Sequence, residues 1–149
     1  MTRMQTRPAP TIHDTDTVAA GVRALLESDL PALPVVDEKG HLVGLFGERE
    51  FMAALFPGYV GELHYAGFVS GVLDDVLEKR AACSDEPVSK HMNSEHVWVD
   101  DQFSDVGLAE TFLHHRVLVV PVERDGRPVG VVVRADFFRR LAEAFIERA

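Results

Sequence analysis

The chain has 149 residues, of which 46% are apolar and 26% charged, and its formal net charge is −9. This composition indicates one globular domain, or two very small domains that share a core, and excludes intrinsic disorder. The negative charge argues against nucleic acid as a partner. No apolar run approaches the roughly 20 residues that span a bilayer, so we expect no membrane partner either. The N-terminus lacks the apolar segment of a signal peptide, and the single cysteine, Cys83, cannot form an internal disulfide. Both features favour a cytoplasmic protein.

The first half of the chain predicts a strand, a helix, two strands and a second helix. Residues 1–10 are polar and contain proline, and we expect them to form a loose arm. Capping residues at Asp14–Thr17 precede a helix whose apolar residues are Ala19, Val22, Leu25 and Leu26. The expected elements are a strand at 11–12, a helix to about 28, strands at 32–36 and 42–46, and a helix from 47–49 to about 57.

Residues 57–87 form an insert between the two halves. The segment Phe56–Phe68 is rich in aromatic residues and glycine, which indicates an ordered loop that either faces a partner or covers a cleft. A helix is expected over Val69–Lys79, with Val72, Leu73 and Val76 as its apolar residues, and one more helical turn over Glu86–Met92. The insert is long for a linker, so we expect it to pack against the rest of the molecule.

The second half repeats the same order of elements. A short strand is expected at Val97–Val99, and Phe103 or Ser104 opens a helix with the apolar residues Val106, Ala109, Phe112 and Leu113. Two β-branched runs, Leu118–Val122 and Pro128–Val133, flank Asp125-Gly126, which is a strong hairpin signal. A helix then runs from Arg134 to about Arg148.

The two halves are an internal duplication. A shift of 87 residues places Pro34 on Pro121 and superimposes the apolar positions of the first helix in each half. After the turn, which is one residue shorter in the second copy, a shift of 86 places Gly44 on Gly130 and Glu50 on Asp136. A copy of about 50 residues is small for an independent core. We therefore predict an α/β fold, an α+β sandwich in which two pseudo-two-fold related copies pack together.

The two hairpins, PVVDEKGHLVGLFGERE and PVERDGRPVGVVVRAD, resemble those of the cystathionine-beta-synthase (CBS) domain, whose tandem pairs are called Bateman modules. The resemblance covers about residues 11–56 and 88–146 and divides the chain into repeat 1 (11–56), the insert (57–87) and repeat 2 (88–149). The family pattern is Gly, two apolar residues, Thr or Ser, two variable residues and Asp. Repeat 2 has Val133 in place of the hydroxyl residue, and repeat 1 has Gly47 there and Glu50 in place of Asp.

The resemblance implies a function as well as a fold. CBS pairs typically bind adenosine compounds, namely AMP, ADP, ATP or S-adenosylmethionine, in clefts between the two copies. They usually report ligand level to a partner protein, and many form homodimers. We therefore expect a stand-alone, non-catalytic regulatory module that is a homodimer.

The predicted ligand site lies in repeat 2. An ionised carboxylate can accept hydrogen bonds from both hydroxyls of a ribose, and Asp136 lies in the first turn of its helix. The alternative is that Asp136 only stabilises that turn. Arg134 is the candidate for phosphate, because Val133 lacks the hydroxyl. The candidates for an apolar adenine slot are Val97, Val99, Val119, Val120 and Pro121.

The corresponding site in repeat 1 has Glu50, which is one methylene longer than Asp, and Gly47, which leaves space but offers no hydroxyl. We expect this site to be empty, altered or structural. His13 and Asp14 lie near its mouth in the repeat alignment, where surface loop residues are the expected interpretation.

Other functions receive less support from the sequence. His114 and His115 are neighbours on a helix and diverge by about 100°, so they do not chelate one ion together, and Cys83 has no evident histidine partner. We therefore expect no metal site and no catalytic residue. Two alternatives stay open: a structural or protein-interaction module that has lost nucleotide binding, and an enzyme with an unrecognised site. The last helix is apolar at Phe137, Phe138, Leu141, Phe145 and Ile146, which favours a homodimer contact or core packing.

Overall fold

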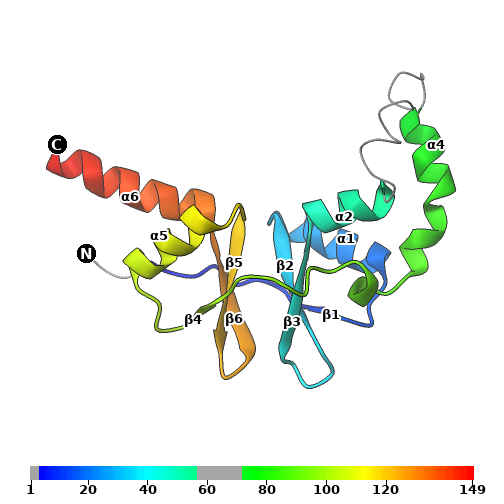
Figure 1. The fold of residues 1–149 in the computed structure, drawn as a ribbon, viewed down its shortest axis with the longest axis horizontal. Helices are drawn as coiled ribbons and strands as arrows, with labels where there is room; N and C mark the ends of the chain where they lie inside the picture. Colours follow the sequence, from blue (N-terminus) through cyan, green and yellow to red (C-terminus); the bar gives the residue numbers. More distant parts are fainter. Residues whose placement is uncertain (1–3, 57–71) are drawn as a thin grey trace.

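The computed structural model describes residues 4–56 and 72–149, which form two three-stranded sheets with helices around them. Figure 1 shows the two hairpins side by side at the centre of the molecule, with helices to either side. The first sheet contains β1 (Ile12–His13), β2 (Ala32–Val36) and β3 (Leu42–Gly47). The second contains β4 (Val99–Asp100), β5 (Val119–Arg124) and β6 (Arg127–Val133).

The two sheets have the same topology, as the duplication requires. In each, the short first strand pairs in parallel with the second, which pairs antiparallel with the third. Asp125 and Gly126 both have positive φ, 54° and 79°, which is the conformation of a two-residue type I′ hairpin turn. The predicted hairpin of repeat 2 is therefore confirmed.

Hydroxyl side chains cap the first helix of each repeat. The helices are α1 (Val18–Ser28), α2 (Glu48–Leu55), α4 (Val72–Lys79), α5 (Asp105–His114) and α6 (Arg134–Arg148), with two 3₁₀ turns, η1 (Ala81–Asp85) and η2 (Val88–Lys90). The Thr17 hydroxyl accepts from the Ala20 N–H at 3.1 Å, and the Ser104 hydroxyl accepts from the Gly107 N–H at 3.0 Å. Of the two residues expected to open the second helix, Ser104 is the cap.

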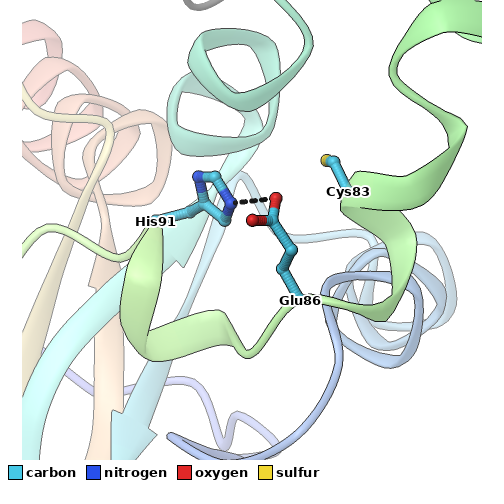
Figure 2. Close-up of side chains that lie close together, drawn as sticks. All are labelled: Cys83, Glu86 and His91. Atoms are coloured by element: carbon cyan, nitrogen blue, oxygen red, sulfur yellow. Dashed lines mark hydrogen bonds and ion pairs between the residues drawn. The ribbon is translucent and has the colours of Figure 1, made fainter.

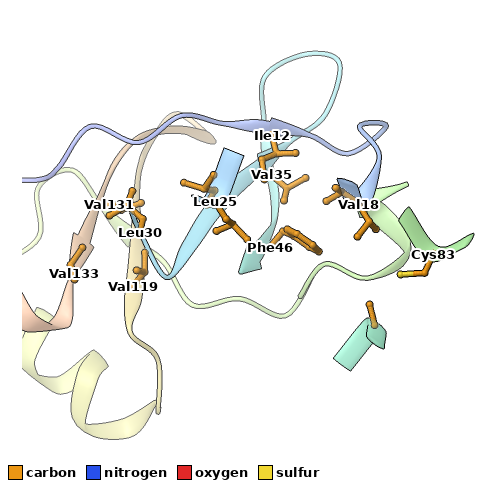
Figure 3. Packing of buried hydrophobic residues seen from close by; sticks show 13 residues of the cluster. Ile12, Val18, Leu25, Leu30, Val35, Phe46, Cys83, Val119, Val131 and Val133 are labelled. Atoms are coloured by element: carbon orange, nitrogen blue, oxygen red, sulfur yellow. The ribbon is translucent and has the colours of Figure 1, made fainter. Parts of the chain in front are cut away.

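The two repeats share one apolar core, as expected. Leu33 and Val35 of β2 belong to the same buried cluster as Val119 of β5 and Val131 of β6, and all four side chains are almost fully buried. Figure 3 shows the packing of this cluster, with residues of both hairpins facing one another. A second, smaller cluster lies within repeat 2, where Leu108 and Phe137 pack on Val122 and Val132.

The expected buried faces of α1 and α5 are partly wrong. Leu26, Val106 and Leu113 are each more than three-quarters exposed. The helices instead bury Gly21 and Leu108, which are equivalent positions in the two repeats. A Cβ at Gly21 would lie 3.1 Å from the Phe46 ring. The buried position in α1 is a glycine, so a search for large apolar residues does not find it.

The N-terminal segment is attached to repeat 2, in contrast to the loose arm that we expected. The Arg7 N–H donates to the Val131 carbonyl at 2.8 Å, and the Val131 N–H donates to the Arg7 carbonyl at 2.9 Å. Asn93 pairs in the same way with Leu45, at 2.8 and 3.0 Å. Both pairs obey the 86-residue shift, so the segment that precedes the first strand of each repeat crosses to the third strand of the other repeat.

The remaining differences concern the ends of elements and the insert. The short strands begin one and two residues later than expected, at Ile12 and Val99. The expected turn over Glu86–Met92 is the 3₁₀ turn η2. The expectation of an ordered aromatic loop falls almost entirely on residues 57–71, outside the described residues. No helix in the described part of the chain is both long and apolar enough to span a bilayer.

Candidate functional site: the clefts at the starts of α2 and α6

Each repeat folds the start of its last helix against the start of its hairpin. The Arg134 N–H donates to the Leu118 carbonyl at 2.9 Å, and the Glu48 N–H donates to the Pro31 carbonyl at 3.0 Å. This return of the chain places Asp136 and Glu50 at equivalent positions in the first turns of α6 and α2. Both carboxylates line cavities of about 600 Å³, a size suitable for a small organic ligand.

Asp136 forms a two-pronged ion pair with Arg7. Arg7 Nε donates to Oδ2 at 2.7 Å and Nη2 donates to Oδ1 at 2.9 Å, which is the fork geometry of an arginine–carboxylate pair. The hydrogen bond and the negative charge of Asp136 raise the pKa of Arg7. The Asp136 side chain is 31% exposed, and its cavity is lined by the segment Met4–Arg7 and one side of α6. The carboxylate is therefore accessible to a ligand, but it is held by an arginine that the sequence analysis assigned to a loose arm.

The other residues predicted for the repeat 2 site lie apart from Asp136. Val133 and Arg134 line a neighbouring, mainly apolar cavity of about 600 Å³, together with Pro31, Leu118 and Phe138. Val133 is buried, while the Arg134 side chain is exposed. The structure therefore does not bring Arg134 into the cavity that contains Asp136.

The predicted adenine slot is only partly accessible. Val120 and Pro121 are buried within β5, whereas Val97 and Val99 are half-buried. None of these four residues lines the cavity of Asp136, the cavity of Glu50 or the apolar cavity beside Val133. Val119, the fifth candidate, lines the cavity of repeat 1. The adenine contacts remain a prediction.

Glu50 is turned toward its own helix. Its Oε1 accepts from the Gly47 N–H at 2.9 Å, which is the reciprocal half of a capping box. Burial raises the pKa of Glu50, against the opposing effect of that hydrogen bond. Its cavity also contains two cations, Arg49 and Arg116, together with Asn93.

Gly47 allows a close approach between β3 and the start of β2. A Cβ at this position would lie 2.4 Å from the Pro31 carbonyl oxygen and 2.6 Å from the Ala32 Cβ. The space that we expected the glycine to leave is filled by this backbone, so the missing hydroxyl of repeat 1 cannot be restored without moving the hairpin. This contact gives Gly47 a structural role.

A third group of polar side chains lies outside both clefts. Cys83, Glu86 and His91 each offer one potential metal-ligand atom, and these atoms lie within 4.8 Å of one another (Figure 2). We did not expect these three residues to lie together, because Cys83 has no histidine next to it in the sequence. The signal that could have found them is the spacing Cys-x₂-Glu-x₄-His within the insert and the lead into repeat 2.

Comparison with protein families agrees with this geometry. The model of the CBS domain matches the chain twice, at residues 2–57 and 88–143. The chain belongs to the CBS-domain family. Each match begins before the first strand of its repeat, so each CBS repeat includes the segment that crosses to the other one.

Solved structures share the fold of this CBS pair. The CBS domain of a CBS domain-containing membrane protein from Sphaerobacter thermophilus is 28% identical, with a TM-score of 0.68 over 90% of this chain and 82% of that one. The structure of CBSX2 in complex with AMP is 19% identical, with a TM-score of 0.67 and 93% of each chain covered, and shows the fold alone.

The chain is also similar in sequence to a longer protein. An uncharacterised protein of Methanocaldococcus jannaschii is 24% identical over 143 residues, which are 96% of this chain. The match covers 32% of that protein, so the present chain corresponds to about a third of its length.

Proposed function

We propose that this CBS pair is a non-catalytic regulatory module that binds an adenosine-containing ligand at Asp136 and relays its occupancy to a partner protein. The observation that supports this function most is the position of Asp136, which lies partly exposed in a cavity at the start of α6. Both of its carboxylate oxygens accept hydrogen bonds from the side chain of Arg7. AMP, ADP, ATP and S-adenosylmethionine all present the ribose diol that such a carboxylate recognises.

The Arg7–Asp136 pair is weak enough for a ligand to replace. Both side chains are substantially exposed, and exposed ion pairs contribute about 0.2–1 kcal/mol. A hydrogen bond from a hydroxyl to a charged acceptor contributes about 1.5–3 kcal/mol. Two ribose hydroxyls can therefore replace the two hydrogen bonds that Arg7 donates to Asp136, and Arg7 then becomes free to meet a negatively charged phosphate.

The relay follows from the connection of Arg7 to both repeats. Arg7 pairs through its backbone with Val131 and precedes repeat 1 in the chain. A ligand that displaces the Arg7 side chain from Asp136 alters the attachment of this segment to β6. The liganded and free states then differ in a surface that a partner can recognise, which is the differential affinity that regulation requires.

We propose one ligand for each chain. Glu50, the equivalent of Asp136, accepts a hydrogen bond from the Gly47 N–H, and the β2 backbone occupies the space beside Gly47. The carboxylate at the Asp136 position of repeat 1 is therefore already engaged. Glu50 and Gly47, with Val133, favour the alternative function, a structural or protein-interaction module without nucleotide binding.

We also propose a homodimer that buries the outer surfaces of α5 and α6. These helices expose apolar side chains next to the apolar cavity that Pro31, Leu118 and Val133 help to line. The exposed side chains are Val106, Leu113, Phe138, Leu141, Phe145 and Ile146. Large exposed apolar patches are typical of interfaces, so we expect the dimer to cover these side chains.

Calorimetry with adenosine, AMP, ATP and S-adenosylmethionine tests the binding site. The isosteric variant Asp136→Asn loses charge-assisted hydrogen bonds, so it should bind the preferred compound about 10- to 150-fold more weakly than the wild type. Glu143→Gln is the control, because Glu143 lines the same cavity and should not contact the ribose. Equal affinities of wild type and Asp136→Asn would reject the site. A folded wild type that binds none of the four compounds would favour the structural alternative.

A further inference from the structure

Three different metal-binding side chains lie close together where the insert meets repeat 2. Cys83 lies in η1, Glu86 follows it, and His91 follows η2. The Cys83 Sγ, a Glu86 carboxylate oxygen and a His91 ring nitrogen lie within 4.8 Å of one another, and His91 Nε2 is 3.1 Å from Glu86 Oε1. Figure 2 shows Glu86 between the other two, with its carboxylate directed to the histidine ring.

The backbone that carries these side chains is fixed to repeat 1. The Val18 N–H donates to the Glu86 carbonyl at 2.8 Å, and the Val88 N–H donates to the Asp16 carbonyl at 2.7 Å. Val88 is completely buried, and Cys83 is almost completely buried in the shared core. The three ligand atoms are therefore presented by a rigid segment, as a binding site requires.

The donor set selects the class of ion. Thiolate and imidazole bind late first-row transition metals, above all Zn²⁺, whereas Mg²⁺ and Ca²⁺ prefer oxygen ligands alone. In a tetrahedral zinc site the Zn–S distance is about 2.3 Å and the Zn–N and Zn–O distances about 2.0–2.2 Å, so ligand atoms lie about 3.3–3.7 Å apart. Closing the present arrangement requires a movement of about 1 Å. Rotation of the half-buried Glu86 and His91 side chains can supply it.

Lys90 completes the arrangement around the carboxylate. Its ammonium pairs with Glu86 Oε2, the oxygen that does not contact His91, and its side chain is largely exposed. Carboxylates that bind a metal through one oxygen are commonly hydrogen-bonded through the other. Lys90 can therefore orient Glu86 without occupying the position of the metal.

We propose that Cys83, Glu86 and His91 bind one divalent late first-row transition-metal ion, Zn²⁺ in the first place, with water at the fourth position. The site is separate from the cleft of Asp136 and does not depend on nucleotide binding. Its effect would be to hold together η1 and η2, the two turns through which the insert and the start of repeat 2 pack on repeat 1.

Titration of the metal-free, untagged chain with Co²⁺ tests this site. Cobalt bound to a thiolate gives a charge-transfer absorption band, and Cys83 is the sole cysteine, so the band reports on this residue alone. We expect saturation at one Co²⁺ per chain and displacement by Zn²⁺. The band should be absent in Cys83→Ala. His91→Gln and Glu86→Gln should each bind at least about 100-fold more weakly, since even changes beyond the direct ligands cost 10- to 100-fold.

His114→Gln is the matched control. His114 also lies near a glutamate, Glu110, at 4.0 Å, but both are exposed. It should bind Co²⁺ like the wild type. Circular dichroism shows whether each variant is folded. If Cys83→Ala does not fold, the Co²⁺ affinities of His91→Gln and Glu86→Gln test the site. A folded wild type without the band, or His91→Gln and Glu86→Gln that bind as tightly as the wild type, would overturn the proposal.

Discussion

The Arg7–Asp136 ion pair joins two residues that are 129 positions apart in the chain. Arg7 donates through two nitrogens, so the carboxylate is oriented before any ligand arrives. In our proposal the ligand competes with Arg7 for Asp136. The pair then sets the threshold concentration at which the module responds.

Removal of Arg7 should therefore strengthen binding of a ligand without phosphate. Arg7→Gln eliminates an exposed ion pair of about 0.2–1 kcal/mol, so adenosine should bind about 1.5- to 5-fold more tightly. Calorimetry with adenosine measures the change. Arg124→Gln is the control, because Arg124 forms a similar exposed pair with Asp101 at 2.6 Å, away from the cavity of Asp136. Weaker adenosine binding by Arg7→Gln would show that Arg7 supports the ligand rather than competing with it.

Glu50 should make stability depend on pH. Its folded-state pKa is raised by burial, so the folded state holds its proton more tightly than the unfolded state. The resulting stabilisation is present below the unfolded pKa, about 4.3, and is lost as the pH rises through the folded-state pKa. Ionised Glu50 therefore opposes folding at pH 7.

Glu50→Gln keeps an oxygen for the Gly47 N–H and removes the ionisation. It should melt at a higher temperature than the wild type at pH 7. The difference should disappear near pH 3.5, where Glu50 of the wild type is mostly protonated and therefore neutral like the glutamine. Thermal unfolding followed by circular dichroism at both pH values measures this effect. Glu27→Gln, at an exposed position of α1, should show no such pH-dependent gain. A variant that is less stable than the wild type at pH 7 would mean that the carboxylate charge stabilises the start of α2.

At the scale of elements, one glycine in the third strand of each repeat lets the crossing segment of the other repeat pack against that strand. A Cβ at Gly130 would lie 2.8 Å from the Arg7 carbonyl oxygen, and a Cβ at Gly44 would lie 2.7 Å from the Met92 Sδ. These are the glycines that the family pattern contains. Their role is close approach: each lets the preceding segment of the other repeat lie against the strand.

Gly130→Ala should detach the N-terminal segment. The new methyl group collides with the Arg7 backbone, so Arg7 should separate from Val131 and its side chain from Asp136. Limited proteolysis should then cleave within residues 4–10 faster than in the wild type, at least several-fold. Val129→Ala, at a more exposed position of the same strand, is the control. Equal cleavage rates for Gly130→Ala and the wild type would contradict the role of this glycine.

The elements themselves could be predicted from the sequence because their signals are local. Asp125-Gly126 between two β-branched runs specified the second hairpin, and Ala32–Val36 was predicted at its observed bounds. The burial of α1 and α5 could not be predicted in full, because Gly21 carries no apolar side chain and Leu26 and Leu113 are exposed. The attachment of Arg7 to Val131 is a long-range backbone contact without a side-chain signal.

The candidate site also has parts that could be predicted from the sequence and parts that could not. The places of Asp136 and Glu50 in the first turns of their helices followed from the repeat, but their partners did not. Nothing local in the sequence connects Arg7 with Asp136, and Glu50 turns to Gly47 through a bond that depends on how β3 enters α2. Sequence can therefore locate a carboxylate at a helix start. For Asp136, the packing of a distant segment decides which group it contacts, whereas Glu50 turns to a residue three positions away in its own helix start.

At the scale of the whole molecule, the apolar surface of α5 and α6 is the feature that should determine assembly. Leu113 lies at the edge of the apolar cavity and is 86% exposed. Leu113→Glu should leave the folded chain intact, because an exposed side chain contributes little to the core. It should convert a dimer to a monomer, as measured by sedimentation equilibrium. Glu27→Gln, on the outer side of α1, should leave the dimer unchanged. A wild type that is monomeric, or a variant that stays dimeric, would contradict the proposed interface.

The central claim is that Asp136 accepts hydrogen bonds from a ribose diol. Binding of adenosine and 2′-deoxyadenosine to the wild type and to Asp136→Asn tests it most directly, since the two ligands differ by one hydroxyl group. The account predicts that the wild type prefers adenosine by about 10-fold or more, as the loss of one charge-assisted hydrogen bond requires, and that Asp136→Asn loses most of this preference. An equal preference for adenosine in both proteins would contradict the claim.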